Sequence, residues 1–266
     1  MFEHAPDGTA YEVTGPEDAP TVVLIHGLGL SRRLWDQHLE AFGGYRIVAY
    51  DLYGHGDSFP VPEIASLTLF ARQIAALLDH LEIAAAHIVG FSIGGMINRR
   101  FALDFPHRTQ SLCILNSPHD RGHKAQETVE ARARTVRDQG AFSTFDAALK
   151  RWFTPACLAG ERAPSAPQLV REWRGQVDAE SYAQTAWVLA HGVRELTGLV
   201  GEISKPALVM TCEHDSGSTV AMTHAIAKEI PGAHTRIVPQ LQHLGLMEAP
   251  DNFTTPILTF LKRFDK

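Results

Sequence analysis

Short apolar runs alternate with amphipathic stretches along most of the chain. The runs are rich in β-branched residues and apolar at nearly every position, as expected of strands that are covered on both faces. They lie at Thr21 to Ile25, Arg46 to Tyr50, Ala86 to Val89, Leu112 to Asn116, Ala207 to Thr211 and Thr235 to Val238. This alternation predicts βαβ units on a mainly parallel sheet.

Two helices are expected beside these strands. From Leu67 to Leu81, apolar residues recur at spacings of three and four, which gives one apolar stripe on a helix. A second helix should run from Gly94 to about Phe105, because Pro106 disfavours its continuation.

The alternation stops after Ser117-Pro118 and resumes only near Lys205-Pro206. The intervening segment contains helical patches at Thr128 to Gln139, Phe142 to Phe153 and Ser181 to Ala190 and no convincing strand, and residues 163–167 read as a break. We therefore predict one core domain formed by residues 1–118 and 196–266, with an inserted helical cap at residues 119–195.

The composition is that of an ordinary folded protein, with 266 residues, 45% hydrophobic and 20% charged. It argues against a disordered, collagenous or coiled-coil chain. The net charge of -6 argues against nucleic acid or an anionic membrane as partner. The sequence shows no secretory signal and no apolar run that could span a membrane, and its three cysteines lack metal-ligand spacing. These features favour a cytoplasmic protein without a metal or cofactor, and its oligomeric state stays open.

Gly90-Phe91-Ser92-Ile93-Gly94 fits G-x-S-x-G and lies between a predicted strand and a predicted helix. That context is the one a nucleophile elbow needs, because a tight turn lifts the serine oxygen clear of the sheet. The helix N-terminus then lies beside Ser92, so the Ile93 N–H can face a developing oxyanion.

A second backbone donor is expected in the loop His26-Gly27-Leu28-Gly29, which follows the first long strand. Its glycines allow main-chain N–H groups to turn into a pocket, and Leu28 N–H is the predicted donor. The His26 side chain is expected to fix this loop by hydrogen bonding.

With these motifs the sequence resembles the α/β-hydrolase superfamily: a mostly parallel sheet flanked by helices, with an inserted helical cap. His26-Gly27, the segment from Asp51 to Ser58, Ser92, the segment from Glu213 to Asp215, and Gln242-His243 stand in the order of that family. Tyr53 stands where the family commonly has arginine, which puts one salt bridge in question.

The resemblance implies an acid after the strand Ala207 to Thr211, at Asp215, although Cys212 stands where glycine is usual. Glu213 is a less favoured substitute, and Asp120 is a rival because some members place the acid after the preceding strand. His243 is the implied general base, completing the chain order Ser, Asp, His.

The resemblance thus predicts a serine hydrolase that cleaves a small carboxylic ester or lactone through an acyl-enzyme, with Ser92, Asp215 and His243 as the triad. The segments Glu213 to Thr219 and Gly90 to Met96 are similar to those of 3-oxoadipate enol-lactonases. Two alternatives stay open. One is hydrolysis of a carbon–carbon bond in a ring-fission product, although the usual Gly-Pro-Gly is absent after His26-Gly27. The other is a ligand receptor without turnover.

The cap is expected to choose the substrate. It carries nearly equal numbers of basic and acidic residues while the rest of the chain is acidic, which slightly favours a substrate with a carboxylate. Five aromatic residues are candidates for the pocket wall: Trp152, Phe153, Trp173, Tyr182 and Trp187.

Overall fold

Strand β3 (Thr21–Ile25) illustrates why the apolar runs form the centre of the molecule. All five of its residues are buried in the computed structural model, which describes residues 2–198 and 202–265. Val22 and Leu24 belong to the hydrophobic cluster on one face of the sheet, and Val23 and Ile25 belong to the cluster on the other. Since both faces are covered, the four residues that follow Thr21 are all aliphatic.

The described residues form one eight-stranded sheet of order β1-β2-β4-β3-β5-β6-β7-β8. Besides β3, the strands are β1 (Glu3–His4), β2 (Ala10–Thr14), β4 (Arg46–Tyr50), β5 (Ala86–Phe91), β6 (Thr109–Leu115), β7 (Ala207–Cys212) and β8 (His234–Val238). The β1–β2 and β2–β4 pairs are antiparallel, and all other pairs are parallel. The six expected strands are confirmed with small shifts at their ends, and β1 and β2 are additions.

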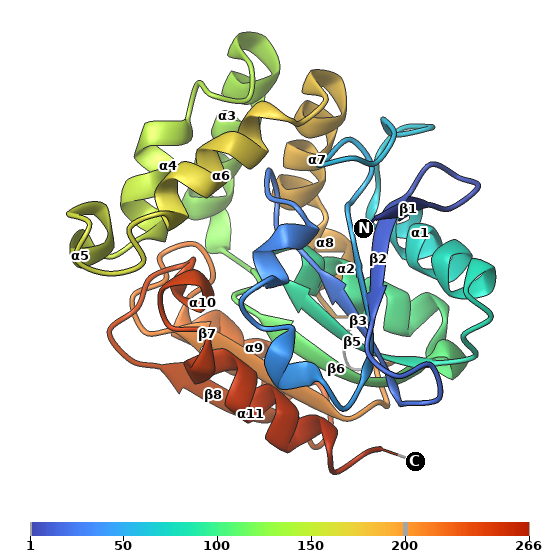
Figure 1. Ribbon diagram of the computed structural model, residues 1–266. Helices are drawn as coiled ribbons and strands as arrows, with labels where there is room; N and C mark the ends of the chain where they lie inside the picture. Colours follow the sequence, from blue (N-terminus) through green and yellow to red (C-terminus); the bar gives the residue numbers. More distant parts are fainter. Residues whose placement is uncertain (1, 199–201, 266) are drawn as a thin grey trace.

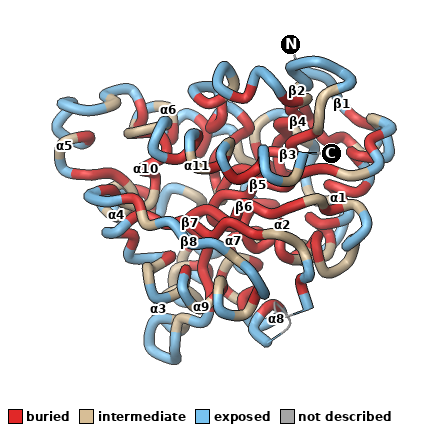
Figure 2. Tube along the Cα trace, turned by 90° about the horizontal axis from the view of Figure 1, so that it is seen from below, coloured by how far each residue is buried: buried red, intermediate tan, exposed pale blue. Residues whose placement is uncertain are grey.

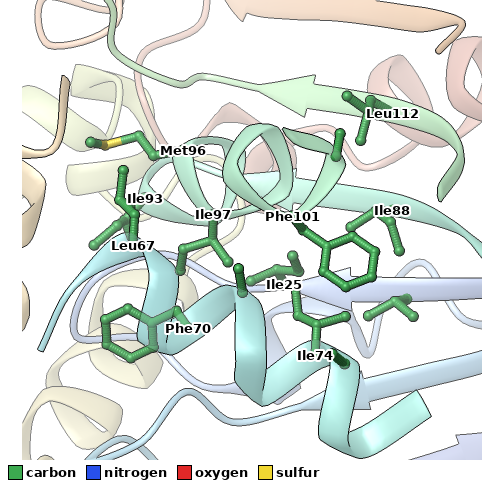
Figure 3. Packing of buried hydrophobic residues seen from close by; sticks show 14 of the residues in the cluster. Ile25, Leu67, Phe70, Ile74, Ile88, Ile93, Met96, Ile97, Phe101 and Leu112 are labelled. Carbon is green, nitrogen blue, oxygen red and sulfur yellow. The ribbon is translucent and has the colours of Figure 1, made fainter. Parts of the chain in front are cut away.

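Helices cover both faces of the sheet (Figure 1). The cluster on one face includes residues of α1 (Leu67–His80), α2 (Ile93–Asp104) and α9 (Val220–Glu229). Figure 3 shows Leu67, Phe70 and Ile74 of α1 packed beside α2, which confirms the predicted stripe. The opposite cluster includes residues of η1 (Arg32–Trp35), η2 (Glu40–Phe42), α10 (Gly245–Glu248) and α11 (Asp251–Leu261).

A short 3-10 helix, η3 (Pro106–Arg108), follows α2 directly. The predicted stop of α2 before Pro106 is therefore confirmed within one residue. No helix among the described residues has both the length and the apolar character needed to cross a bilayer.

Between β6 and β7 the described residues form helices and no strand. These are α3 (Gly122–Gln139), α4 (Phe145–Trp152), α5 (Pro155–Leu158), α6 (Ala166–Gly175), α7 (Ala179–His191) and α8 (Val193–Leu196). Helices α3 to α6 gather at one end of the sheet (Figure 1), and α3 carries long exposed stretches (Figure 2). We keep the name cap for residues 119–195, whose boundaries stay a prediction.

Candidate active site

The turn that presents Ser92 depends on two glycines. Ser92 follows β5 and caps α2 with φ 59° and ψ -116°, a conformation that costs a non-glycine residue about 1–3 kcal/mol. A Cβ atom on Gly90 would lie 2.1 Å from the carbonyl oxygen of Gly94, and one on Gly94 would lie 2.7 Å from that of Ile25. Gly90 therefore lets the end of β5 approach the start of α2, and Gly94 lets the start of α2 approach the end of β3, as the motif predicts.

Ser92, His243 and Asp215 form a continuous chain of hydrogen bonds. His243 Nε2 lies 3.2 Å from Ser92 Oγ, and His243 Nδ1 lies 2.6 Å from Asp215 Oδ2. The carboxylate accepts a hydrogen bond from Nδ1–H, which leaves Nε2 unprotonated and free to accept one from the serine hydroxyl. Ser92 is 7% exposed, so its oxygen is close to the surface of a cavity and shielded from bulk water.

Asp215 lies in a ring of donors that keeps it ionised. Besides His243, Asn116 Nδ2 donates to Oδ2 at 2.9 Å, and the N–H groups of Gly217 and Ser218 donate to Oδ1. Burial by itself raises the pKa of Asp215, but His243, Asn116 and the Ser218 N–H outweigh it and hold this pKa below its ordinary value. The sequence analysis did not name Asn116 as a site residue. Its position directly after β6 could have indicated it, because β6 is the neighbour of β7 and the chain after β7 carries Asp215.

The two other acid candidates lie apart from His243. Asp120 is exposed, and its Oδ1 accepts from the N–H of Gly122 at the start of α3. Glu213 accepts from the N–H of Gln240. Of the three acids considered, Asp215 is the one that meets the histidine.

Cys212, which replaces the usual glycine, fits without opening the loop that carries Asp215. The N–H of Asp215 donates to the Cys212 carbonyl at 3.1 Å, which closes a tight turn. The Cys212 sulfur lies against Gly245, where an added Cβ would be only 2.7 Å away. The small residue two positions after His243 therefore makes room for the larger one at position 212.

The two predicted backbone donors belong to adjoining segments. Leu28 lines the cavity next to Ser92, and Ile93 is the first residue of α2. The close contact of Gly94 with the backbone of Ile25 and His26 places the start of α2 against this loop. Within the described residues, neither N–H has an acceptor in the chain.

His26 holds the loop from inside the fold. Its Nδ1 donates to the Gly27 carbonyl at 2.7 Å, and its Nε2 accepts from the N–H of Leu52 at 3.0 Å. Burial lowers the pKa of His26 to about 4, so the ring is neutral at pH 7. These bonds agree with the structural role expected for it.

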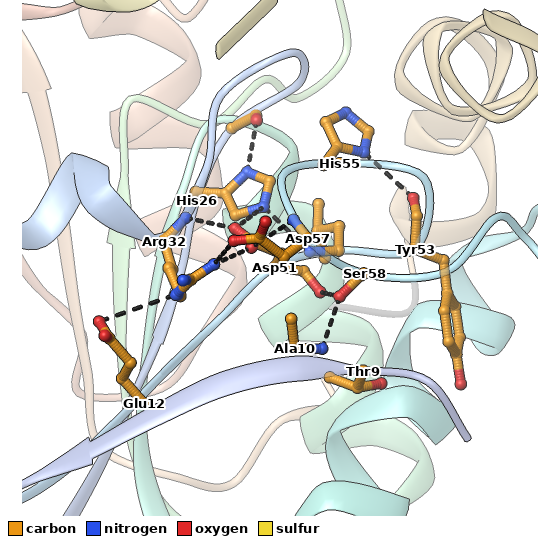
Figure 4. A network of polar contacts seen from close by, with 12 residues as sticks. Thr9, Ala10, Glu12, His26, Arg32, Asp51, Tyr53, His55, Asp57 and Ser58 are labelled. Carbon is orange, nitrogen blue, oxygen red and sulfur yellow. Dashed lines mark hydrogen bonds and ion pairs between the residues drawn. The ribbon is translucent and has the colours of Figure 1, made fainter. Parts of the chain in front are cut away.

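A buried ionic network lies beneath this loop (Figure 4). Asp51 accepts from the Arg32 N–H at 2.7 Å and from the Arg32 guanidinium, which also binds Asp57 at 2.8 Å. Tyr53 instead donates to Asp7 at 2.7 Å. The buried ion pairs of this turn are therefore made by Arg32, and the tyrosine at position 53 makes a hydrogen bond in place of a salt bridge.

A cavity of about 280 Å³ lies above Ser92, between the sheet and the cap. Trp152 and Tyr182 line it, and the Trp152 ring centroid lies 6.3 Å from that of His243. Phe153 and Trp173 are buried in the core, and Trp187 is 38% exposed and stacks on His191 outside the cavity. Of the five aromatic candidates, two belong to the pocket wall.

Comparisons with known proteins agree with this architecture. A model of the alpha/beta hydrolase family matches residues 22–254. The 3-oxoadipate enol-lactonase 2 of Acinetobacter baylyi is 28% identical over 96% of this chain and 93% of its own length. The enol-lactonase of Burkholderia xenovorans superposes with a TM-score of 0.88 at 28% identity, covering 98% of this chain and 100% of that one. A thermophilic esterase from Thermogutta terrifontis gives 0.86 at 26% identity, covering 97% and 94%.

The chain belongs to the alpha/beta hydrolase family. It is a hydrolase, and the relatives that it resembles include proteins named enol-lactonase, in agreement with the likeness that the sequence motifs indicated.

Proposed function

We propose that this hydrolase cleaves a small carboxylic ester or lactone through an acyl-enzyme on Ser92. The observation that carries the proposal is the hydrogen-bond chain from Ser92 Oγ through His243 to Asp215, at the floor of a cavity that suits a small molecule. The similarity to proteins named enol-lactonase and esterase supports the choice of bond.

In the first half of the reaction, Ser92 Oγ attacks the carbonyl carbon while His243 Nε2 takes its proton. The carbonyl oxygen becomes negative and receives hydrogen bonds from the N–H groups of Leu28 and Ile93. As the carbonyl re-forms, the bond to the leaving oxygen breaks and His243 gives that oxygen the proton. In a lactone, the leaving hydroxyl stays attached to the acyl group.

In the second half, water attacks the acyl-enzyme and His243 accepts one of its protons. The bond to Ser92 then breaks, and His243 returns the proton to the serine oxygen, so the enzyme is regenerated. Asp215 stays ionised throughout, because it holds the Nδ1 proton in place and stabilises the imidazolium that forms twice.

The test is Ser92→Ala, assayed with a series of p-nitrophenyl esters and small lactones. Removal of the nucleophile should lower kcat by about 10⁴- to 10⁶-fold. A phosphonate inhibitor should label wild-type protein once per chain and leave the variant unlabelled. Folded Ser92→Ala protein that keeps more than about a tenth of wild-type activity would contradict the nucleophile assignment.

The same assay separates the two alternatives. Turnover of a dienoic ring-fission product in preference to every ester and lactone would favour carbon–carbon hydrolysis. Tight stoichiometric binding of an ester without product release would favour a receptor.

A further inference from the structure

The cavity above Ser92 is strongly basic. Four arginines from the cap line it, and Asp215 is the one carboxylate among its described lining residues. That carboxylate already accepts from His243, Asn116 and two backbone N–H groups. The cavity wall therefore offers the arginines no free counter-charge. The four arginines are Arg121, Arg132, Arg151 and Arg174.

Two of the four arginines have partners within the protein. Arg121 donates to the carbonyls of Leu189 and Ala190. Arg174 is 2% exposed, donates to the Ala141 carbonyl, and faces the rings of Phe145, Trp152 and Tyr182 with centroid distances of 5.4, 5.5 and 4.5 Å. Cation–π contacts of this kind hold a guanidinium in place.

The other two arginines lack such partners. Within the described residues, Arg132 on α3 forms no hydrogen bond or ion pair, and Arg151 on α4 bonds only to the Ala147 carbonyl of its own helix. Burial lowers the pKa of both arginines, and the charge of Arg132 lowers that of Arg151 further. The two arginines thus line the same cavity, and neither has a counter-ion among the described residues.

The remaining arginines of α3 show that this is not a general property of the helix. Arg134 lies 3.9 Å from Glu130, and Arg137 lies 3.5 Å from Glu180. Neither of them lines the cavity. The arginines of α3 that face away from the cavity therefore pair with acidic residues at the surface, whereas Arg132 does not.

We propose that Arg132 and Arg151 form an anion subsite that binds a carboxylate of the substrate, remote from the carbonyl that Ser92 attacks. The proposal rests on the ester or lactone hydrolysis proposed above and defines its substrate class. A guanidinium offers parallel N–H donors that match the two oxygens of a carboxylate. The cap wall near these arginines is apolar, with Ala133, Val136 and Ala148, and suits the carbon chain between the two ends.

The kinetic test compares two methyl esters of equal length that differ in one charge, monomethyl adipate and methyl hexanoate. The wild type should prefer the charged ester in kcat/KM. Arg132→Gln and Arg151→Gln should each lower the ratio of kcat/KM for the charged ester to kcat/KM for the neutral ester by about 10- to 100-fold. Arg134→Gln, on the same helix and outside the cavity, should keep the wild-type ratio, and Arg132→Lys should restore part of it. No preference in the wild type, or an unchanged ratio in both glutamine variants, would overturn the subsite.

A binding test separates this proposal from the proposed function. Calorimetry with adipate on Ser92→Ala protein should detect binding that the additional change Arg132→Gln weakens by about 10-fold or more. Inorganic phosphate binding as tightly as adipate would overturn the assignment to a carboxylate. Arginine-dependent adipate binding in a protein that cleaves neither ester would uphold the subsite and refute ester hydrolysis.

Discussion

Gly90→Ala tests whether the position of Ser92 depends on the close approach of β5 and α2. The added Cβ would lie 2.1 Å from the Gly94 oxygen, 2.4 Å from the Gly94 carbonyl carbon and 2.8 Å from the Gly95 nitrogen. All three atoms are main chain, so no side-chain rotation relieves the clash. The shortest of these distances, 2.1 Å, must grow by about 1.4 Å to reach an ordinary contact of about 3.5 Å, so the elbow and the helix must separate by more than about 1 Å.

That displacement moves Ser92 and Ile93 relative to His243, which is held separately after β8. A misplacement of about 1 Å costs about 100-fold in rate, and overpacking of this kind costs about 1–3 kcal/mol of stability. We therefore expect kcat/KM for a p-nitrophenyl ester to fall about 100-fold and the urea midpoint to decrease.

Gly44→Ala is the matched control, because an added Cβ there meets nothing within 4 Å. Its kinetics and urea midpoint should equal those of the wild type. Phosphonate titration normalises each rate to the reactive fraction, so partial unfolding is not mistaken for a slower site. Gly90→Ala protein within about threefold of wild-type kcat/KM would refute the reasoning, because the elbow would then tolerate the displacement.

Asp215→Asn should lower kcat about 10,000-fold with little change in substrate binding, whereas Asp120→Asn should stay near wild type in the same ester assay. The reverse order of effects would place the acid after β6. Low pH should also lower the stability of the fold, because three histidines are buried in their neutral form. Burial lowers the pKa of His26 and of His38 to about 4 and that of His55 to about 3. The unfolded chain binds protons at these positions near pH 6.5 and the folded chain does not, so stability is complete above that pH and falls by up to about 4 kcal/mol per pH unit toward pH 4. Urea denaturation between pH 7 and pH 5 measures this loss, and a flat profile would contradict it.

Local pattern was enough to predict the central strands and the helices that pack on them. β3 is aliphatic from Val22 to Ile25 because both faces of the sheet are covered. The stripe of α1 has a helical period because one face of that helix meets the core. Strand β2 was missed because its second half is exposed and its pairing with β4 is decided by chain that lies far away in sequence. Helix α3 begins at Gly122, earlier than expected, because its polar first turns bury no residue and leave no periodic signal.

The site divides in the same way. Ser92 is marked by a local motif, since the elbow needs glycines at fixed spacing around the nucleophile, and His243 and Asp215 were proposed from their order along the chain. No local motif indicates the roles of Asn116 and Arg32, because their partners Asp215 and Asp51 lie on segments distant in sequence.

The cap arginines show the limit most clearly. In sequence, Arg132 and Arg134 are two arginines of one helix of mixed charge. Only the packing of α3 against α7 turns Arg132 into the cavity and leaves Arg134 beside Glu130. The order of residues therefore determined the strands and the motif that presents the nucleophile, whereas the charge of the pocket was decided by which side of a helix the tertiary structure covers.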